Sequence, residues 1–118
     1  GTLLVDIWCG GICGLNQHLF KVTSDKYPKW FVYYWTKYHL AKFIRIAKDK
    51  AVTMGHIKRG DLETSEVLIP NAEILSKMDN IIAPIFAAII SRRVENKTLA
   101  TLRDTLLPKL MNGEIKTE

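Results

Sequence analysis

Residues 73–112 read EILSKMDNIIAPIFAAIISRRVENKTLATLRDTLLPKLMN. Apolar residues recur there at alternating spacings of three and four, which is the heptad pattern of an amphipathic helix that packs on another helix. The pattern falls on Arg92 and Asn96 in the middle, and an apolar stripe resumes after them. Polar positions of this kind cost stability but specify register and partner. The predicted helix-pairing residues are Leu75, Met78, Ile82, Ile85, Ile89, Leu99, Leu102, Leu106 and Leu110.

Local signals predict both ends of this helix. Asn71 is a suitable N-cap, and Glu73 lies in the first turn, where the helix dipole favours an acidic side chain. Gly113 predicts the stop. Pro84 predicts a kink or loosened first turns, and Pro108 predicts a bend near the end.

The length of this helix implies a partner. About 40 residues form a rod of about 60 Å, whereas the remaining 70 or so residues can build only a small core. The apolar stripe therefore needs a second helix, from a partner or from another part of the protein. Because the chain opens directly on a strand-like stretch without a starting Met, we expect it to be a piece of a larger polypeptide.

The residues before the helix predict an α+β arrangement. Short β-branched or alternating stretches predict strands at Thr2–Trp8, Gln17–Val22 and Ser65–Ile69. The stretch from Lys29 to about Ala47 has helical periodicity, but its apolar stripe changes face near His39, which predicts a break or burial on two sides. The predicted organisation is a small unit of few short strands plus helices over residues 1–70, one long coiled-coil-type helix over 71–115, and a tail at 116–118.

Aromatic residues and basic charge both accumulate in the first unit. Phe31, Tyr34, Trp35 and Tyr38 share one helical face, a spacing that favours core packing over a base-stacking platform. The chain has net charge +5, and residues 26–59 contain nine basic residues and one acid. This segment is either a solvated face or a surface for phosphates, which would give salt-dependent and sequence-blind affinity.

Residue patterns for catalysis or metal binding are weak. Cys9 and Cys13 with His18 and His39 lack the tight second pair of a zinc site, so we expect no metal. No Ser, Cys or carboxylate stands in a nucleophile or acid–base context, which predicts a non-catalytic protein. The longest apolar run, Ile81–Ile90, holds ten residues including Pro84 and is too short to span a membrane. The scarcity of cysteine suits a reducing cytoplasm.

Several stretches, in order, resemble the specificity (S) subunit of type I restriction–modification enzymes. They are GTLL (1–4), LNQHLFKV (15–22), FVYYW (31–35), TMGHIKRGDL (53–62), VLIP (67–70) and, most specifically, LRDTLLPKLMNGEI (102–115). The resemblance covers nearly the whole chain. It implies that residues 1–70 are part of a DNA target recognition domain and that the long helix is a coiled-coil spacer.

The resemblance also implies a division of labour in a bacterial or archaeal cytoplasm. The chain would recognise double-stranded DNA and direct adenine methylation and restriction by partners. Those partners would be methyltransferase (modification) subunits, a motor/nuclease restriction subunit, and a second spacer helix from the same protein or a homodimer, with no membrane involved. S-adenosylmethionine, ATP and magnesium would belong to partner subunits, leaving no cofactor here.

The DNA-binding residues expected by position are Lys48, Lys50, Thr53, His56, Lys58 and Arg59. Lysine and arginine there would mostly meet phosphates, whereas Arg59 or His56 could reach a base edge. A lone histidine such as His56 is more often structural. The alternative function is a coiled-coil oligomerisation module without a DNA role. An unrelated DNA-binding regulator is a weaker alternative, because no helix-turn-helix pattern or basic zipper run is present.

Overall fold

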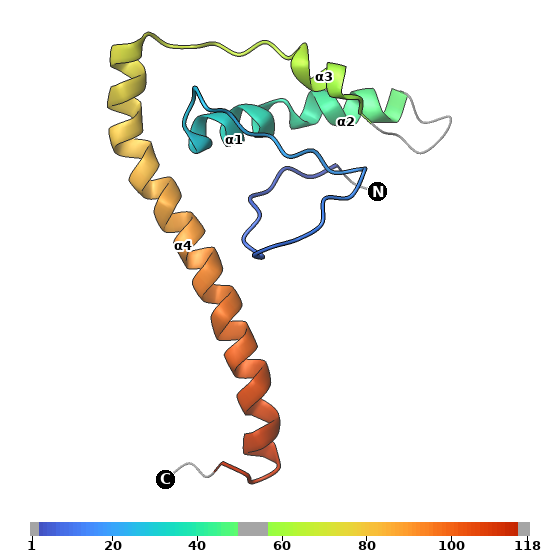
Figure 1. Ribbon diagram of the computed structural model, residues 1–118, viewed down its shortest axis with the longest axis vertical. Helices are drawn as coiled ribbons and strands as arrows, with labels where there is room; N and C mark the ends of the chain where they lie inside the picture. Colours follow the sequence, from blue (N-terminus) through green and yellow to red (C-terminus); the bar gives the residue numbers. More distant parts are fainter. Residues whose placement is uncertain (1–2, 50–56, 116–118) are drawn as a thin grey trace.

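The computed structural model describes residues 3–49 and 57–115. Its helices are α1 (Lys29–Tyr38), α2 (Leu40–Asp49), α3 (Arg59–Glu63) and α4 (Ala72–Met111). The smaller elements lie beside the first half of α4, and the second half of α4 projects away from them (Figure 1). The radius of gyration is 19.9 Å, whereas a compact domain of this length would have about 13.5 Å. The chain is therefore a small unit attached to a long, partly uncovered rod.

The expected α+β class is wrong for the described part of the chain, which forms helices and irregular segments without a β-strand. The segment at 3–9 still shows the alternation expected of a strand, because Leu3, Val5 and Ile7 are half-buried while the residues between them are exposed. A strand also requires a neighbour that bonds its N–H and C=O groups. The described residues at 3–8, 17–22 and 65–69 do not pair with one another in this way.

The break predicted near His39 is confirmed. α1 ends at Tyr38, His39 follows with φ −78° and ψ −5°, and α2 begins at Leu40. The backbone N–H of His39 still donates to Trp35 O at 3.1 Å, and Phe43 N donates to His39 O at 3.0 Å. The two helices are therefore joined by a single residue. α2 runs to Asp49, two residues beyond the predicted end.

Both predicted ends of the long helix are confirmed. The Asn71 side chain accepts a hydrogen bond from Ile74 N at 2.8 Å, which satisfies one of the free N–H groups of the first turn. α4 ends at Met111 with Asn112 as its C-cap, and Gly113 follows with φ +76°, a left-handed conformation that suits glycine. Pro84 and Pro108 lie inside the uninterrupted helix. Figure 1 shows the axis turning after the first few turns of α4, as expected near Pro84.

Aromatic packing attaches the unit to α4. Trp30 and Phe31 from α1 and Phe86 from α4 form a buried cluster, and Tyr33 lies 5.5 Å from Phe86 between ring centroids. Trp30 Nε1 donates to Asp79 Oδ1 at 2.6 Å, so its polar edge also binds α4. Core packing is thus confirmed for Phe31, while Tyr34 and Tyr38 are exposed. The buried core is small, as the length of the chain predicted.

By length and composition alone, α4 would suffice to cross a membrane, and it is the one such helix in the described residues. That criterion is weak for a single helix, because core helices meet it too. In this structure the apolar half of α4 carries Phe86, which packs on α1, and Asp79, which binds Trp30. The expectation of no membrane partner was based on the apolar run Ile81–Ile90 alone, whereas the whole of α4 is long and apolar enough.

Candidate nucleic-acid interface

Three of the six residues expected to bind DNA lie in the described structure. Lys48 is exposed in the last turn of α2, Lys58 directly precedes α3, and Arg59 is the first residue of α3. Lys50, Thr53 and His56 lie outside the described residues, so the structure does not place them. α3 itself begins within the TMGHIKRGDL stretch and runs from Arg59 to Glu63.

The start of α3 holds Lys58 and Arg59 at the surface. Lys58 N donates to Asp61 Oδ2 at 2.8 Å, which fixes the backbone where the helix begins. Arg59 Nε lies 3.8 Å from Glu63 Oε1, with both side chains more than two-thirds exposed. An ion pair so exposed contributes little to stability. The Arg59 guanidinium can therefore exchange this carboxylate for a phosphate at small cost.

α2 adds a basic residue that was missing from the expected site. Phe43 and Ala47 are buried, while Arg45 and Lys48, three residues apart, are exposed on the other side of the helix. Residues three apart are neighbours on a helix surface. The sequence carried this signal, because basic residues recur every three positions at Lys42, Arg45 and Lys48. Arg45 therefore extends the basic surface along α2.

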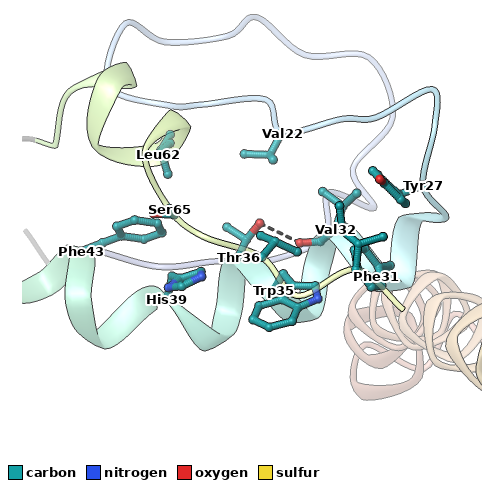
Figure 2. Close-up of a pocket in the computed structure, with 12 residues that line it drawn as sticks. Val22, Tyr27, Phe31, Val32, Trp35, Thr36, His39, Phe43, Leu62 and Ser65 are labelled. Carbon is teal, nitrogen blue, oxygen red and sulfur yellow. Dashed lines mark hydrogen bonds between the residues drawn. The ribbon is translucent and has the colours of Figure 1, made fainter. Parts of the chain in front are cut away.

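A hollow of about 240 Å³ lies among α1, α2, α3 and two extended segments (Figure 2). Its lining is almost entirely apolar and comprises Val22, Tyr27, Phe31, Val32, Trp35, Thr36, His39, Phe43, Leu62, Ser65, Val67 and Ile69. The Thr36 hydroxyl donates to Val32 O at 2.7 Å within α1. Most of this lining consists of apolar and aromatic side chains.

His39 connects the two sides of this hollow. Its Nε2 lies 2.9 Å from Glu66 O, and because a carbonyl only accepts, Nε2 carries the proton. The ring also stacks on Trp35, with centroids 5.9 Å apart. This contact joins the α1–α2 junction to residues 64–70, which lead into α4. The described residues contain no group of three His, Cys, Asp or Glu side chains able to hold a metal.

The predicted helix-pairing residues divide into two groups. Leu75, Met78 and Ile82 are half-buried and pack against the Trp30–Phe31–Phe86 cluster. The others are exposed, and they are Ile85, Ile89, Leu99, Leu102, Leu106 and Leu110. The first group therefore already has a partner within the chain. The second group forms an apolar surface that nothing in the described structure covers.

An ion pair extends the attachment of the unit further along α4. Arg93 Nη1 donates to Asp6 Oδ1, from the extended segment at 3–9. This hydrogen bond, followed by that from Ile7 N, holds the pKa of Asp6 below its usual value. The same partner raises the pKa of Arg93. Asp79, Phe86 and Arg93 are seven residues apart and so share one face of α4.

Two curated proteins match this chain. It is 32% identical over 104 residues to the type I restriction enzyme MjaIX specificity subunit of Methanocaldococcus jannaschii, a match that covers 86% of this chain and 24% of that protein. It is 29% identical over 76 residues to the type I restriction enzyme HindI specificity subunit of Haemophilus influenzae, covering 64% of this chain and 17% of that protein. No protein-family model matches the chain. No solved structure matches it either.

These matches agree with the resemblance in the sequence motifs. They include most of the chain, yet the chain spans only about a quarter or less of the length of these curated relatives. Over that part, the chain is related to type I restriction enzyme specificity subunits.

Proposed function

We propose that this chain recognises a specific DNA sequence for a type I restriction–modification complex and carries out no catalysis itself. The match over 104 residues to a specificity subunit is the observation that carries this proposal. The exposed basic residues of α2 and α3 support it, because duplex DNA is bound first through its phosphates.

In the proposed assembly this chain recognises the DNA sequence, and other subunits carry out catalysis. Methyltransferase subunits with S-adenosylmethionine would modify adenine, and a motor/nuclease subunit with ATP and magnesium would restrict unmodified DNA. We place the assembly in the cytoplasm. The uncovered face of α4 would pair with a second spacer helix and so set the distance between two recognised half-sites.

The proposed DNA surface comprises Arg45 and Lys48 on α2 with Lys58 and Arg59 at α3. Lys50, Thr53 and His56, which the sequence also predicts to bind DNA, lie outside the described residues. Lysine and arginine would hold phosphates and orient the unit, while Arg59 or His56 would approach base edges.

Charge reversal at Lys58 and Arg59 tests this surface. The double variant Lys58→Glu, Arg59→Glu should bind every duplex more weakly and lower the slope of log affinity against log salt by about two. Fluorescence anisotropy with labelled duplexes over a salt series measures both. The matched control is Lys97→Glu, Lys109→Glu on α4, which makes the same change in net charge away from this surface.

The control should retain both affinity and slope more nearly than the test variant. Unchanged affinity of Lys58→Glu, Arg59→Glu at low salt would exclude this part of the chain as the phosphate contact. An equal loss in both variants would show that only net charge matters.

A further inference from the structure

His39 lies at the single-residue junction between α1 and α2, and both helices hold its ring. The ring stacks on Trp35 of α1 with centroids 5.9 Å apart, and it lies 6.0 Å from the ring of Phe43 of α2. Its backbone is fixed as well, because its N–H donates to Trp35 O and its carbonyl accepts from Phe43 N. The two helices together therefore set the direction of the imidazole.

The Nε2 edge of this ring binds a segment that lies far along the chain. Nε2 donates to Glu66 O at 2.9 Å, across 27 positions of sequence. Figure 2 shows His39 on the helices, below the segment that carries Leu62 and Ser65. The hydrogen bond therefore connects the α1–α2 junction to the residues that directly follow α3.

α3 is itself bonded to this following segment. Thr64 N and Thr64 Oγ1 both donate to Gly60 O, at 3.0 and 2.8 Å. Ser65 Oγ donates to Asp61 O at 3.1 Å. Because these bonds join residues 64 and 65 to a helix of only five residues, α3 moves together with the backbone around Glu66.

The hydrogen bond of His39 supplies a direction that the surrounding contacts lack. The other residues between the helices and this segment are mostly apolar and line the hollow of about 240 Å³. Apolar contacts are non-directional and permit small sliding movements. A hydrogen bond weakens steeply as its distance and angle change. His39 is therefore the described side chain that specifies where Glu66, and with it α3, lies against the helices.

We propose that His39 is a positioning residue for DNA recognition. Through Glu66 O it fixes α3, which carries Lys58 and Arg59, relative to the basic residues of α2. The proposal rests on the proposed function for its biological role, because it concerns the same DNA surface. His39 touches no phosphate itself. It acts by ordering groups that would otherwise have to be ordered at the moment of binding, at a cost in affinity.

Two substitutions separate the donor of His39 from its ring. His39→Gln loses the ring, but its amide nitrogen can lie close to the position of Nε2 and donate to Glu66 O. His39→Phe keeps a ring that can contact Trp35 and Phe43, but it has no donor. If the hydrogen bond positions α3, the Gln variant should behave like the parent chain and the Phe variant should not. Positioning by ring stacking alone predicts the opposite order.

The position of α3 can be measured without DNA. In a background with Cys9→Ser and Cys13→Ser, spin labels at Ala41→Cys and Glu63→Cys, both exposed, report the distance between α2 and α3. The parent chain and His39→Gln should give a narrow distance distribution, whereas His39→Phe should give a broader or displaced one. Circular dichroism checks that all three chains have the same helical content. Equal distributions in all three would overturn the proposal.

A double-mutant cycle then tests whether His39 acts through α3. His39→Phe should weaken duplex binding about two- to tenfold, the range expected for one hydrogen bond, while His39→Gln should retain the parent affinity. In a Lys58→Gln, Arg59→Gln background, His39→Phe should cause no further loss, because the groups that it positions no longer hold phosphates. The matched background is Lys97→Gln, Lys109→Gln on α4, in which the full loss should persist.

The two measurements distinguish failure of this proposal from failure of the proposed function. A loss of affinity in His39→Phe that persists in the Lys58→Gln, Arg59→Gln background would assign His39 a general role in stability and overturn the proposal. Absence of duplex binding by the parent chain would contradict the proposed function instead. In that case a broadened spin-label distribution in His39→Phe alone would still support the control of α3 by His39.

Discussion

The contacts of single residues explain how the extended segment at 3–9 is held without a sheet. Ile7 packs against the aromatic cluster, and Asp6 accepts from Arg93. The two interactions lie on either side of the same backbone, as in a half-buried strand. They attach the segment to α4 rather than to a neighbouring strand. The Asp6–Arg93 pair is the polar part of this attachment.

The Asp6–Arg93 pair should make stability fall in acid. Because the pKa of Asp6 is lower in the folded chain than in the unfolded chain, the pair stabilises above the ordinary aspartate pKa. That stability is lost as pH falls through the lower, folded value. Asp6→Asn should therefore flatten the change in unfolding free energy between pH 5 and pH 2, measured by urea unfolding.

The effect should be small and should shrink with added salt, because both side chains are about half exposed. Asp25→Asn, on the loop before α1, is the matched control and should leave the acid dependence closer to that of the parent chain. An Asp6→Asn variant with the full acid dependence of the parent would contradict this role.

Asn71 has an equally local role at the start of α4. Asn71→Ala removes the acceptor for Ile74 N and should lower the free energy of unfolding by about 1 kcal/mol. Asn71→Asp keeps an acceptor and should cost much less. Thermal or urea unfolding followed by circular dichroism measures the difference. Equal stability of the two variants would show that water satisfies this N–H as well as the side chain does.

At the scale of elements, α4 is one helix with two roles. Its first half carries the residues that bind α1, whereas the part after Arg93 has exposed leucines and no described contact with the small unit. Isolated helices gain most of their stability from packing an apolar face. We therefore expect the second half to depend on a partner helix more strongly than the first half does.

Phe86 should be the main anchor between α4 and α1. It is 6% exposed and contacts the rings of Tyr33 and Tyr34. Truncation of a buried phenylalanine costs about 3–5 kcal/mol, a large share of what so small a core provides. Phe86→Ala should therefore loosen the small unit from α4, seen as faster exchange of the hydrogen-bonded amides of α1.

Leu107→Ala is the control for Phe86→Ala, because Leu107 is 51% exposed on the free half of the helix. It should leave amide exchange in α1 unchanged. Slow exchange in α1 of the Phe86→Ala variant would mean that Trp30–Asp79 and the Asp6 pair suffice to hold the unit.

Local signals predicted the helices well and the strands poorly. The ends of α4 and the break at His39 depend on neighbouring residues, such as Asn71 and Gly113, so the sequence reveals them. A strand depends on pairing with a distant segment. The hydrophobic periodicity and β-propensity of the stretch itself carry no information about that pairing. The stretches at 3–8 and 65–69 therefore look like strands in sequence and remain unpaired in the described structure.

At the scale of the whole molecule, a small basic unit packs against the part of α4 up to Arg93, and the rest of α4 has no described contact with that unit. The sequence predicted the rod, its apolar seam and the basic segment. The sequence did not reveal that Leu75, Met78 and Ile82 pack against the chain's own aromatic cluster, because two adjacent faces of α4 are both apolar. Only packing distinguishes the face that is used from the face that is free.

The DNA surface is less determined by sequence than the helix. Composition indicated a basic segment but not which side chains would share a face. The structure groups Arg45 with Lys48 on α2 and places Lys58 and Arg59 at the start of α3. The base sequence that such a surface reads depends on the side chains that reach base edges.

The most direct test of the account is a methylation map of the source genome by long-read sequencing, with and without the gene that encodes this chain. If this chain directs adenine methylation, deletion of its gene should abolish methylation at one split, two-part adenine motif. Restoring the gene should restore the mark. A map that is unchanged by deletion in cells that express the gene would contradict a role in DNA recognition for a restriction–modification complex.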